Sequence, residues 1–273
     1  NTTGSYNTAV GYYSLTNNTT GSYNTAVGDR ALDSNVSGAR NTAVGYKSLE
    51  DTGNGNDNTA VGYQALDDCA SSGNTAVGSD ALNLNTTGDK NTAVGAFALD
   101  ANTTGQYLCA FGYEALSTSD TESYNNAFGY QALKVANGGR FNTAIGWKVM
   151  AALTTGDDNT GVGHDTMPQL TTGDDNTAIG NNSLYALTTG DNNTALGSYS
   201  LHNMTTADAN TAVGFKAMEA NTSGQYNQAF GHGALLKNTT ASNNTAIGTN
   251  ALNVNTTGSS NIAIGNTALY SNT

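Results

Sequence analysis

A repeat of 17 residues constrains this chain more than any other feature of its sequence. The stretch NTAVGDRAL begins at Asn24, and a close copy, NTAVGYKSL, begins at Asn41. Sixteen copies follow one another along 273 residues, and Leu108 replaces the opening Asn in one of them. The one irregular step is the 16 residues from Asn58 to Asn74. Because a single deletion leaves the later phase unchanged, each copy is expected to form one structural coil.

The consensus of one coil, numbered from its Asn, is N-T-A-h-G-x-x-A-L-x-x-N-T-T-G-x-x, where h is Val, Ile, Leu or Phe. Gly at coil positions 5 and 15 disfavours helices, and a helical repeat would need about 30 residues. Short extended segments between Gly and Asn turns predict an all-β fold, a parallel β-solenoid (β-roll) of about 16 coils. At a strand spacing of about 4.8 Å these coils would form a rod of about 75 Å. A single repeat domain is predicted over 1–273, as a segment of a longer array.

Composition and charge exclude several classes of function. Nine Lys and Arg against 21 Asp and Glu give a net charge of −12, which repels nucleic acid and anionic bilayers. No apolar run approaches the roughly 18 residues of a membrane span. Regularly spaced apolar residues and few charges argue against disorder. We therefore expect a folded chain that neither binds nucleic acid nor inserts into a membrane.

Two apolar columns are predicted to fill the core when the coils stack. Coil position 9 is always Leu or Met, and coil position 4 is always Val, Ile, Leu or Phe. Alternate residues of a strand face opposite sides, and we predict that the residue at position 4 points inward. The predicted core ladder consists of Val10, Leu15, Val27, Leu32, Val44, Leu49, Phe111, Leu116, Phe128, Leu133, Phe230 and Leu235.

The same alternation predicts that the Ala at coil position 3 points outward. A long outward stripe of small apolar residues suits the close approach of a second copy of the chain. The alternative is that Ala is the small inward residue of a thin coil. The predicted interface of a homo-oligomer, which could extend into a filament, consists of Ala9, Ala26, Ala43, Ala60, Ala76 and Ala93.

Coil position 12 changes in blocks between Asn and apolar residues. An inward corner of the coil explains both, because stacked Asn amides can hydrogen-bond from coil to coil while stacked Leu side chains pack. Ladders of like residues are therefore predicted at this corner. The blocks are Asn18 and Asn35, Asn85 and Asn102, then Leu153, Leu170, Leu187 and Met204, and then Asn221, Asn238 and Asn255.

The densest charged cluster lies in the phrases TTGDDNT and TTGDNNT. Stacking would place equivalent carboxylates about 4.8 Å apart, where Ca²⁺ could relieve their repulsion. Solvated turn residues are the alternative interpretation, and the Ca²⁺-binding nonapeptide of other solenoids is absent. No other cofactor is expected. The candidate metal ligands are Asp157, Asp158, Asp174, Asp175 and Asp191.

Aromatic residues recur at coil position 6. Such a stripe can bind a surface glycan or a protein ligand through its amphipathic rings. Shielding of an oligomer seam is the alternative role. The candidate binding residues are Tyr12, Tyr46, Tyr63, Tyr113, Tyr130 and Trp147.

The remaining chemically active residues are too scattered for catalysis. His164, His202 and His232 fall in coils that are not neighbours, so no two of them can share a zinc ion. Cys69 and Cys109 are more than two coils apart, too far for a disulfide. No Ser, His and Asp grouping recurs in adjacent columns. We predict that the chain is not an enzyme. Its Asn-x-Thr triplets follow from the turn consensus and do not indicate glycosylation by themselves.

The phrases NTAVG and NTAIG resemble the Asn-x-x-Ala-Ile-Gly coils in the head domains of trimeric autotransporter adhesins. The 17-residue unit with its NTTG turn resembles arrays in phage tail-fibre proteins and similar bacterial surface proteins. These resemblances imply a left-handed parallel β-roll packed as a homotrimer, although the coils of autotransporter heads are shorter. They also imply an extracellular fibre segment, which acts as a stiff spacer or receptor-binding shaft on a virion or cell surface.

Two other functions are left open by the sequence. A Thr-rich solenoid can bind ice, but the paired Thr residues at coil positions 13 and 14 are adjacent and face opposite ways, which leaves one outward Thr column. A carbohydrate-binding module or an enzyme could also be built on a surface filament.

Overall fold

The computed structural model of this chain describes residues 1–272. They form two compact units, Asn1–Gly138 and Gly139–Thr273. The described residues contain sixteen parallel strands, one for each coil, and no helix. Residues 1–272 accordingly include no helical segment that could cross a membrane. The prediction of an all-β parallel solenoid from the 17-residue period is confirmed.

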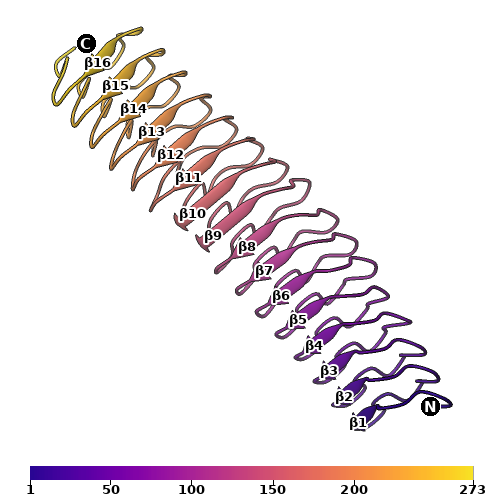
Figure 1. The fold of residues 1–273 in the computed structure, drawn as a ribbon. Coiled ribbons are helices and arrows are strands. Elements are labelled where there is room, and N and C mark those ends of the chain that lie inside the picture. The colour runs from indigo at the N-terminus through magenta and orange to yellow at the C-terminus, as the bar shows by residue number, and fades with distance from the viewer. Residues whose placement is uncertain (273) are drawn as a thin grey trace. The chain divides into compact units, whose positions relative to one another are not determined.

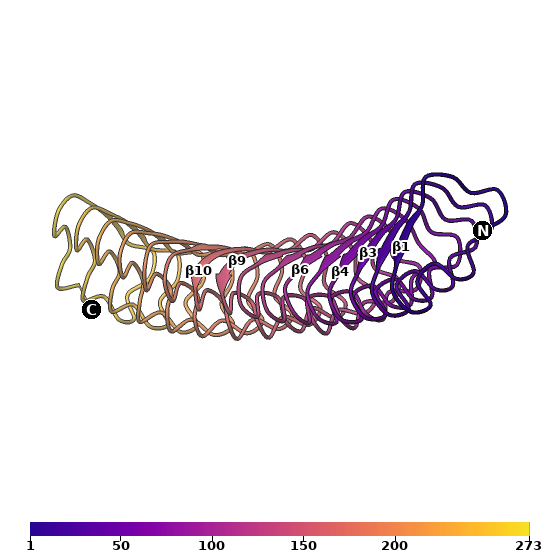
Figure 2. The same cartoon turned by 90° about the horizontal axis from the view of Figure 1, so that it is seen from below.

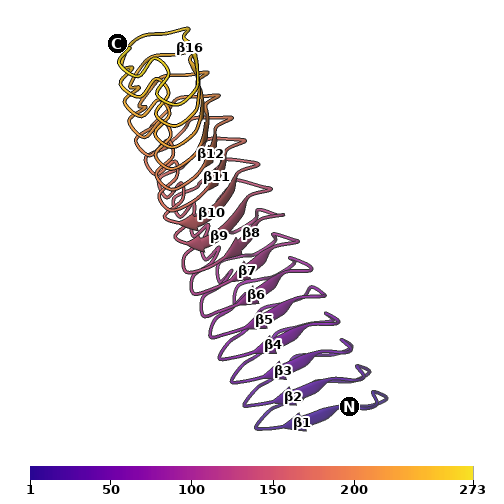
Figure 3. The ribbon, with the colours of Figure 1, turned by 60° about the vertical axis from the view of Figure 1, so that its left-hand side comes forward.

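The first unit contains eight strands of three residues each (Figure 1). Neighbouring strands are parallel, and the same coil position lies opposite itself, so that Thr8 pairs with Thr25 and Thr25 pairs with Thr42. Figure 3 shows these strands stacked along one side of the coils. The strands are β1 (Thr8–Val10), β2 (Thr25–Val27), β3 (Thr42–Val44), β4 (Thr59–Val61), β5 (Thr75–Val77), β6 (Thr92–Val94), β7 (Cys109–Phe111) and β8 (Asn126–Phe128).

The second unit repeats this arrangement with eight further strands. Successive coils follow the same path, as the view in Figure 2 shows. Its first two strands are longer because their pairing continues past the Gly turn to Trp147 and His164. The strands are β9 (Thr143–Trp147), β10 (Thr160–His164), β11 (Thr177–Ile179), β12 (Thr194–Leu196), β13 (Thr211–Val213), β14 (Gln228–Phe230), β15 (Thr245–Ile247) and β16 (Ile262–Ile264).

Hydrogen bonds between coils continue around the turns, beyond the strands themselves. In the second unit the amide of Gly197 donates to the carbonyl of Ile179 in the preceding coil at 2.8 Å. The amide of Leu184 donates to the carbonyl of Ser200 in the following coil at 3.0 Å. Different positions of one coil therefore bond in opposite directions. This pairing satisfies backbone groups that short turns would otherwise leave without partners.

The turns hold bulky residues in the left-handed backbone region. Coil positions 7, 9 and 17 share this conformation, with φ of 57° at Arg30, 53° at Leu32 and 63° at Tyr23. Left-handed backbone costs an L-residue roughly 1–2 kcal/mol, so it persists only where the surroundings enforce it. Here the hydrogen bonds to both neighbouring coils enforce it. The left-handed residues also interrupt strand-like alternation, and Ala31 and Leu32 are consequently both buried although they are adjacent.

The interior of each coil is thin and consists mainly of the Ala and Leu columns. Ala26 and Leu32 are fully buried. Coil positions 3 and 8 face each other across this interior, as the exception at Gly161 shows. A Cβ added to Gly161 would lie 2.5 Å from Cγ1 of Val149, which replaces the usual small residue at position 8. A larger residue on one side therefore requires a smaller one on the other.

The prediction that coil position 4 points inward and coil position 3 points outward is wrong. The predicted core residues Val10, Val27, Val44, Phe111, Phe128 and Phe230 are 37–59% exposed. The predicted interface residues Ala26, Ala43, Ala60, Ala76 and Ala93 are fully buried, although Ala9 is exposed. Alternation specifies which residues share a face but not which face is inside, and Ala is the small inward residue of a thin coil. The Leu part of the core ladder is buried at Leu15, Leu32, Leu49, Leu116, Leu133 and Leu235.

In every strand except β9 and β10, the strand ends immediately before the Gly at coil position 5, where a side chain would not fit. The φ of Gly28 is 142°, a conformation that L-residues rarely adopt. A Cβ at Gly28 would lie 2.2 Å from the carbonyl oxygen of Gly45 in the next coil. The Gly column therefore allows adjacent coils to approach to hydrogen-bonding distance at the turn.

Candidate functional site

The outward side of the strands is the most regular surface of each unit. This strand face presents coil positions 2 and 4, a column that is mostly Thr beside a column of Val, Ile, Leu or Phe. In the first unit Val27, Val44 and Phe111 are each 37% exposed. In the second unit Ile145 and Leu196 are 42% and 40% exposed. A regular exposed apolar column of this kind makes the strand face a candidate interaction surface.

The aromatic stripe at coil position 6 lies just beyond the Gly turn. Rings in neighbouring coils stack on one another, at 5.3 Å between the centroids of Tyr46 and Tyr63 and 5.7 Å for Tyr113 and Tyr130. Stacking covers the ring faces that a sugar would otherwise contact. Binding by this stripe stays a prediction. Tyr12, Tyr46, Tyr63, Tyr113 and Trp147 are 42–66% exposed, and Tyr130 is half-buried.

The Asp residues predicted as Ca²⁺ ligands include a hydrogen-bonded column at coil position 16. Oδ1 of Asp174 accepts the backbone N–H of Asp157, and Oδ1 of Asp191 accepts that of Asp174, both at 2.8 Å. Asp158 and Asp175 lie at the left-handed position 17 and are exposed. Within residues 1–272, no group of three or more His, Cys, Asp or Glu is arranged to hold a metal ion. Calcium binding stays a prediction.

The opening Asn is a buried structural residue in the inner coils, apart from the coil that opens with Leu108. Oδ1 of Asn176 accepts the backbone N–H of Asn193 in the next coil at 3.0 Å. Nδ2 of Asn176 donates to the carbonyl of Gly190, at the end of its own coil, at 2.8 Å. One side chain therefore closes its coil and joins it to the next. Burial and bonding of this kind indicate packing rather than ligand binding.

The predicted Asn ladder at coil position 12 is confirmed. Nδ2 of Asn238 donates to Oδ1 of Asn221 at 3.0 Å, and Nδ2 of Asn255 donates to Oδ1 of Asn238 at 3.1 Å. These amides also belong to Asn-x-Thr or Asn-x-Ser triplets. Because they are fully buried, their nitrogens are not presented as acceptors for a glycan.

The scattered cysteines and histidines keep separate positions. Cys69 is buried and free, Cys109 is half-buried and free, and burial raises the pKa of both thiols. Cys69 occupies the inward corner of the shortened coil, with Sγ 3.1 Å from Oγ of Ser71. A buried protonated thiol is a poor nucleophile. His164 and His232 stack on aromatic rings of the preceding coil, with centroids 6.3 and 5.5 Å apart.

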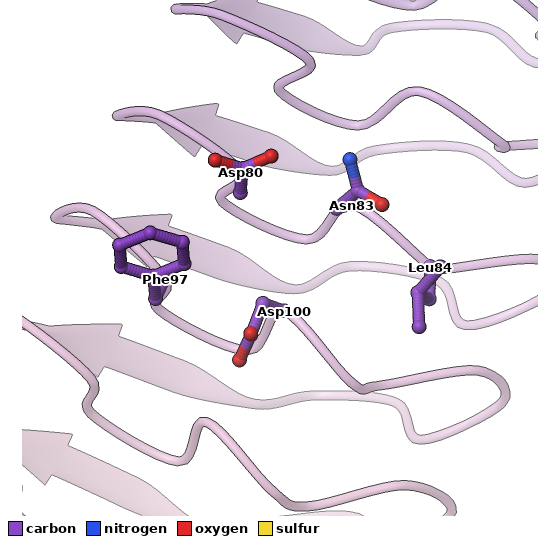
Figure 4. Close-up of a pocket in the computed structure, with 5 residues that line it drawn as sticks. All are labelled: Asp80, Asn83, Leu84, Phe97 and Asp100. Atoms are coloured by element: carbon purple, nitrogen blue, oxygen red, sulfur yellow. The ribbon is translucent and has the colours of Figure 1, made fainter.

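The sequence did not predict a shallow trough on the first unit. Two adjoining hollows, of about 180 and 320 Å³, share Phe97 and Asp100 in their linings. Figure 4 shows Phe97 below Asp80, which lies on the preceding coil, and beside Asp100, which lies on the same coil as Phe97. The signal in the sequence is Phe97 itself, because it interrupts a column that is otherwise mostly polar in this unit, with Gln64 and Glu114 at the same coil position.

Asp100 is the most perturbed acid of the trough. Its Oδ1 is enclosed and has no hydrogen-bond partner among the described residues. Burial, with smaller contributions from the nearby charges of Glu114 and Asp80, raises the pKa of Asp100 to about 6, although backbone hydrogen bonds to the carboxylate partly oppose the shift. The carboxylate therefore titrates close to neutral pH, which an exposed Asp does not.

Comparison of the chain with protein-family models, with curated proteins and with solved structures found no match. The function is therefore inferred from the surfaces of the molecule. The two that stand out are the strand face, which runs along each unit, and the trough on the first unit.

Proposed function

We propose that this chain is a structural segment of an extracellular filament, in which copies of the solenoid associate through their strand faces into a homotrimer. The observation that carries the proposal is the exposed apolar column at coil position 4. Each described coil contributes one such side chain, and those of the inner coils are about two-fifths exposed, as at Val44 and Ile179. A monomeric soluble protein rarely presents an apolar column of this regularity.

The energy available from this surface grows with the number of coils. Burying the exposed part of a Val or Ile side chain contributes about 1 kcal/mol. The eight strands of one unit would then supply about 8 kcal/mol, comparable to the cost of immobilising a partner. A long array therefore associates more strongly than a short one. The strand face also excludes charge, which suits the centre of an interface.

A trimer fits the narrowness of the strand face. Each three-residue strand presents only two outward side chains, at coil positions 2 and 4. Three copies around a common axis would cover both columns, because each chain then contacts two neighbours. The resemblance to trimeric autotransporter heads supports the same arrangement. The stripe at coil position 6 would then lie near the rim of the seam, where amphipathic rings are favourable.

The mechanical role follows from the bonding between coils. Backbone hydrogen bonds run in both directions from each coil, and the buried Asn ladders add side-chain bonds along the array. Such a repeat resists local opening because each coil is held by two neighbours. We assign it the role of a stiff spacer or receptor-binding shaft on a virion or cell surface, with a host glycan or protein as its outer partner.

Sedimentation equilibrium tests the association directly. The wild-type chain should show three times the 27.8 kDa mass of one copy. The double variant Val44→Lys and Ile179→Lys places charges in the apolar column and should sediment as a monomer. The control Asn192→Lys changes an exposed residue at coil position 17 and should remain trimeric. A wild-type chain that stays monomeric at tens of micromolar would contradict the proposal.

The location is tested separately. Antibodies against the folded chain should label intact cells or particles of the source without permeabilisation. Labelling that requires permeabilisation would contradict an extracellular filament while leaving the association result unaffected.

Ice binding is a second candidate because the strand face also carries outward Thr side chains. Thr25 and Thr42 lie opposite one another in adjacent strands, and the same column is Thr in most coils. The Thr at coil position 13 is instead used internally, since Oγ1 of Thr188 donates to the carbonyl of Thr205 at 2.9 Å. A monomer that produces freezing hysteresis, lost in Thr42→Lys, would favour ice binding over self-association.

A further inference from the structure

We propose that the trough on the first unit binds an alkylammonium ligand, a protonated amine on an apolar stem, of which a linear diamine is the simplest example. The trough lies over coil positions 6 to 11, beyond the Gly turn from the strand face. Its lining includes neither of the strand-face columns at coil positions 2 and 4, and it shares only Tyr113 with the aromatic stripe at the rim of the proposed seam.

The walls of the trough combine carboxylates with apolar surface. Asp80, Phe97 and Glu114 hold the same position in three successive coils, with Asp100 beside them. Neighbouring coils are about 4.8 Å apart, so the acidic groups are distributed along the trough. Phe97 and Leu84 are 37% and 48% exposed and offer apolar contact. An elongated ligand with charged ends and an apolar middle matches this alternation.

The negative charge of the trough is only partly balanced. Nζ of Lys134 lies 2.5 Å from Oε2 of Glu114, so that this pair is already neutralised. Asp80 accepts the hydroxyl of Ser79 at 2.7 Å, which adds no positive charge. Neither Asp80 nor Asp100 forms an ion pair with any described residue. Two carboxylates are thus left for an external cation.

An ammonium group suits these side chains better than other ligands. It has three N–H donors and no acceptor, which matches carboxylate oxygens. It is also attracted to the face of an aromatic ring such as Phe97, and the attraction increases when water is excluded. A phosphate or carboxylate ligand would be repelled by Asp80 and Asp100. A neutral diol would leave the two carboxylate charges unbalanced.

The orientation of the side chains favours a ligand that spans more than one coil. In Figure 4 Asp80 and Phe97 lie one above the other, with the carboxylate of Asp80 pointing away from Phe97 and the carboxylate of Asp100 pointing toward the following coil, away from Asn83. The first hollow contains Asp80, and the second contains Glu114 and Tyr113. A diamine could place one ammonium beside Asp80 and the other beside Asp100, with its stem against Phe97.

Calorimetric titration of the full chain with 1,4-diaminobutane at pH 7 and constant ionic strength tests the site. We expect saturable binding, about fivefold weaker binding of butylamine because one ion pair is lost, and no binding of 1,4-butanediol. Asp100→Asn should weaken diamine binding by about tenfold or more, and Phe97→Gln by about threefold. Circular dichroism should show that both variants keep the fold.

Asp67→Asn is the matched control. Asp67 has the same coil position as Asp100, its Oδ1 also lacks a hydrogen-bond partner among the described residues, and burial raises its pKa too. It lines neither hollow, so its substitution should leave affinity unchanged within about twofold. Equal weakening by Asp67→Asn and Asp100→Asn would show that the amine only responds to overall charge, and would overturn the proposal. Diol binding as strong as diamine binding would also overturn it.

The pH dependence provides a second readout. The groups that face Asp100 are Asp80, Glu114 and Lys134. Because Asp100 ionises near pH 6, diamine binding should strengthen between pH 5 and pH 7, and bound diamine should lower the pKa of Asp100. A carboxyl resonance of Asp100 whose titration is unchanged by saturating diamine would contradict contact at this residue.

Discussion

The second unit contains two versions of the same inward corner. One is apolar and the other is a ladder of amides, yet the backbone follows the same path through both, and all of these side chains are fully buried. The difference teaches that the coil accepts either an apolar or an amide side chain at this position. It requires that the residues at this position in neighbouring coils be of the same kind, so that apolar side chains pack together or amides hydrogen-bond to each other. The apolar corner consists of Leu153, Leu170, Leu187 and Met204, and the amide corner consists of Asn221, Asn238 and Asn255.

The two corners satisfy the adjoining carbonyls in different ways. In the amide corner, Nδ2 of Asn238 donates to the carbonyl of Ala241 and to Oδ1 of Asn221, each at 3.0 Å. In the apolar corner the opening Asn alone donates to the equivalent carbonyl, from Nδ2 of Asn176 to Gly190 at 2.8 Å. The opening Asn also bonds to the previous one in both corners, from Asn176 to Asn159 at 3.1 Å and from Asn227 to Asn210 at 3.2 Å. A buried polar column is stable only when each member has partners above and below.

The largest effect is expected where the opening Asn supports the apolar corner. Asn176→Ala removes a fully buried side chain that bonds to Asn159, Gly190 and Asn193. The buried donors and acceptors that lose their hydrogen-bond partners should lower the free energy of unfolding by about 4 kcal/mol. Hydrogen exchange should show faster opening of the adjoining coils. Asn192→Gly, at an exposed left-handed position, should leave stability unchanged or slightly higher.

A break inside the apolar corner should be somewhat smaller. Leu170→Asn places an amide between Leu153 and Leu187, where its oxygen has no ladder partner. We expect a loss of about 3 kcal/mol from the cavity and the unsatisfied acceptor. Urea unfolding measures it. Leu170→Met should cost less than about 1 kcal/mol, because volume is conserved; equal effects of the two substitutions would refute the matching rule.

The converse change tests the amide corner. Asn238→Leu removes the donor to Asn221 and the acceptor for Asn255, while it gains apolar burial. The net loss should be about 1–2 kcal/mol. Replacing all three Asn residues by Leu should recover most of that loss, because an all-apolar column leaves no stranded amide. Additive losses in the triple variant would contradict this explanation.

The smallest effect concerns pH. Neither corner ionises, so the stability difference between Leu170→Asn and wild type should be the same at pH 5 and pH 8. The wild-type chain itself should lose stability as pH rises through about 6, because the pKa of Asp100 is raised from 3.8 when folded and the folded state holds the proton more tightly. Asp100 is half-exposed, so we expect less than about 1 kcal/mol. Asp100→Asn should reduce this decline in urea unfolding, and Asp67, whose pKa is also raised by burial, should account for part of the remainder.

Periodicity was sufficient to predict the architecture and the corner. A period of 17 with Gly and Asn turns excludes helices, and the block-wise exchange of Asn for Leu identifies an inward position. Both inferences depend on comparing copies within one chain. The Leu column was predicted for the same reason, because a position that is always Leu or Met is almost always buried.

The side of the strand could not be predicted from alternation, although the sequence contains a signal for it. Coil position 3 is Ala in all but one coil, where it is Gly161, whereas coil position 4 ranges from Val to Phe. A thin interior tolerates little change in volume, so the constant small residue is the inward one. The adjacent buried residues at positions 8 and 9 depend on left-handed backbone at Arg30 and Leu32, which no local preference of these residues favours.

The trough was not predictable because its lining residues come from several coils and are far apart in the sequence. Phe97 and Asp100 are three residues apart, but the hollows also need Leu84 from the preceding coil and Lys134 from two coils later. The depth of a surface hollow depends on the sizes of the individual side chains in adjacent coils. The repeat period does not predict those sizes at variable surface positions.

The bonds that each coil makes to both neighbours have a consequence for how such a chain can evolve. Since the opening Asn of one coil accepts the backbone N–H of the equivalent residue in the next coil, as Asn176 does from Asn193, excising or duplicating one stretch of 17 residues joins surfaces that already match. Length can therefore change in whole coils through unequal recombination, with little penalty at the junction. The shortened coil at Cys69 shows that even one missing residue is absorbed locally, and the ladder continues on either side of it.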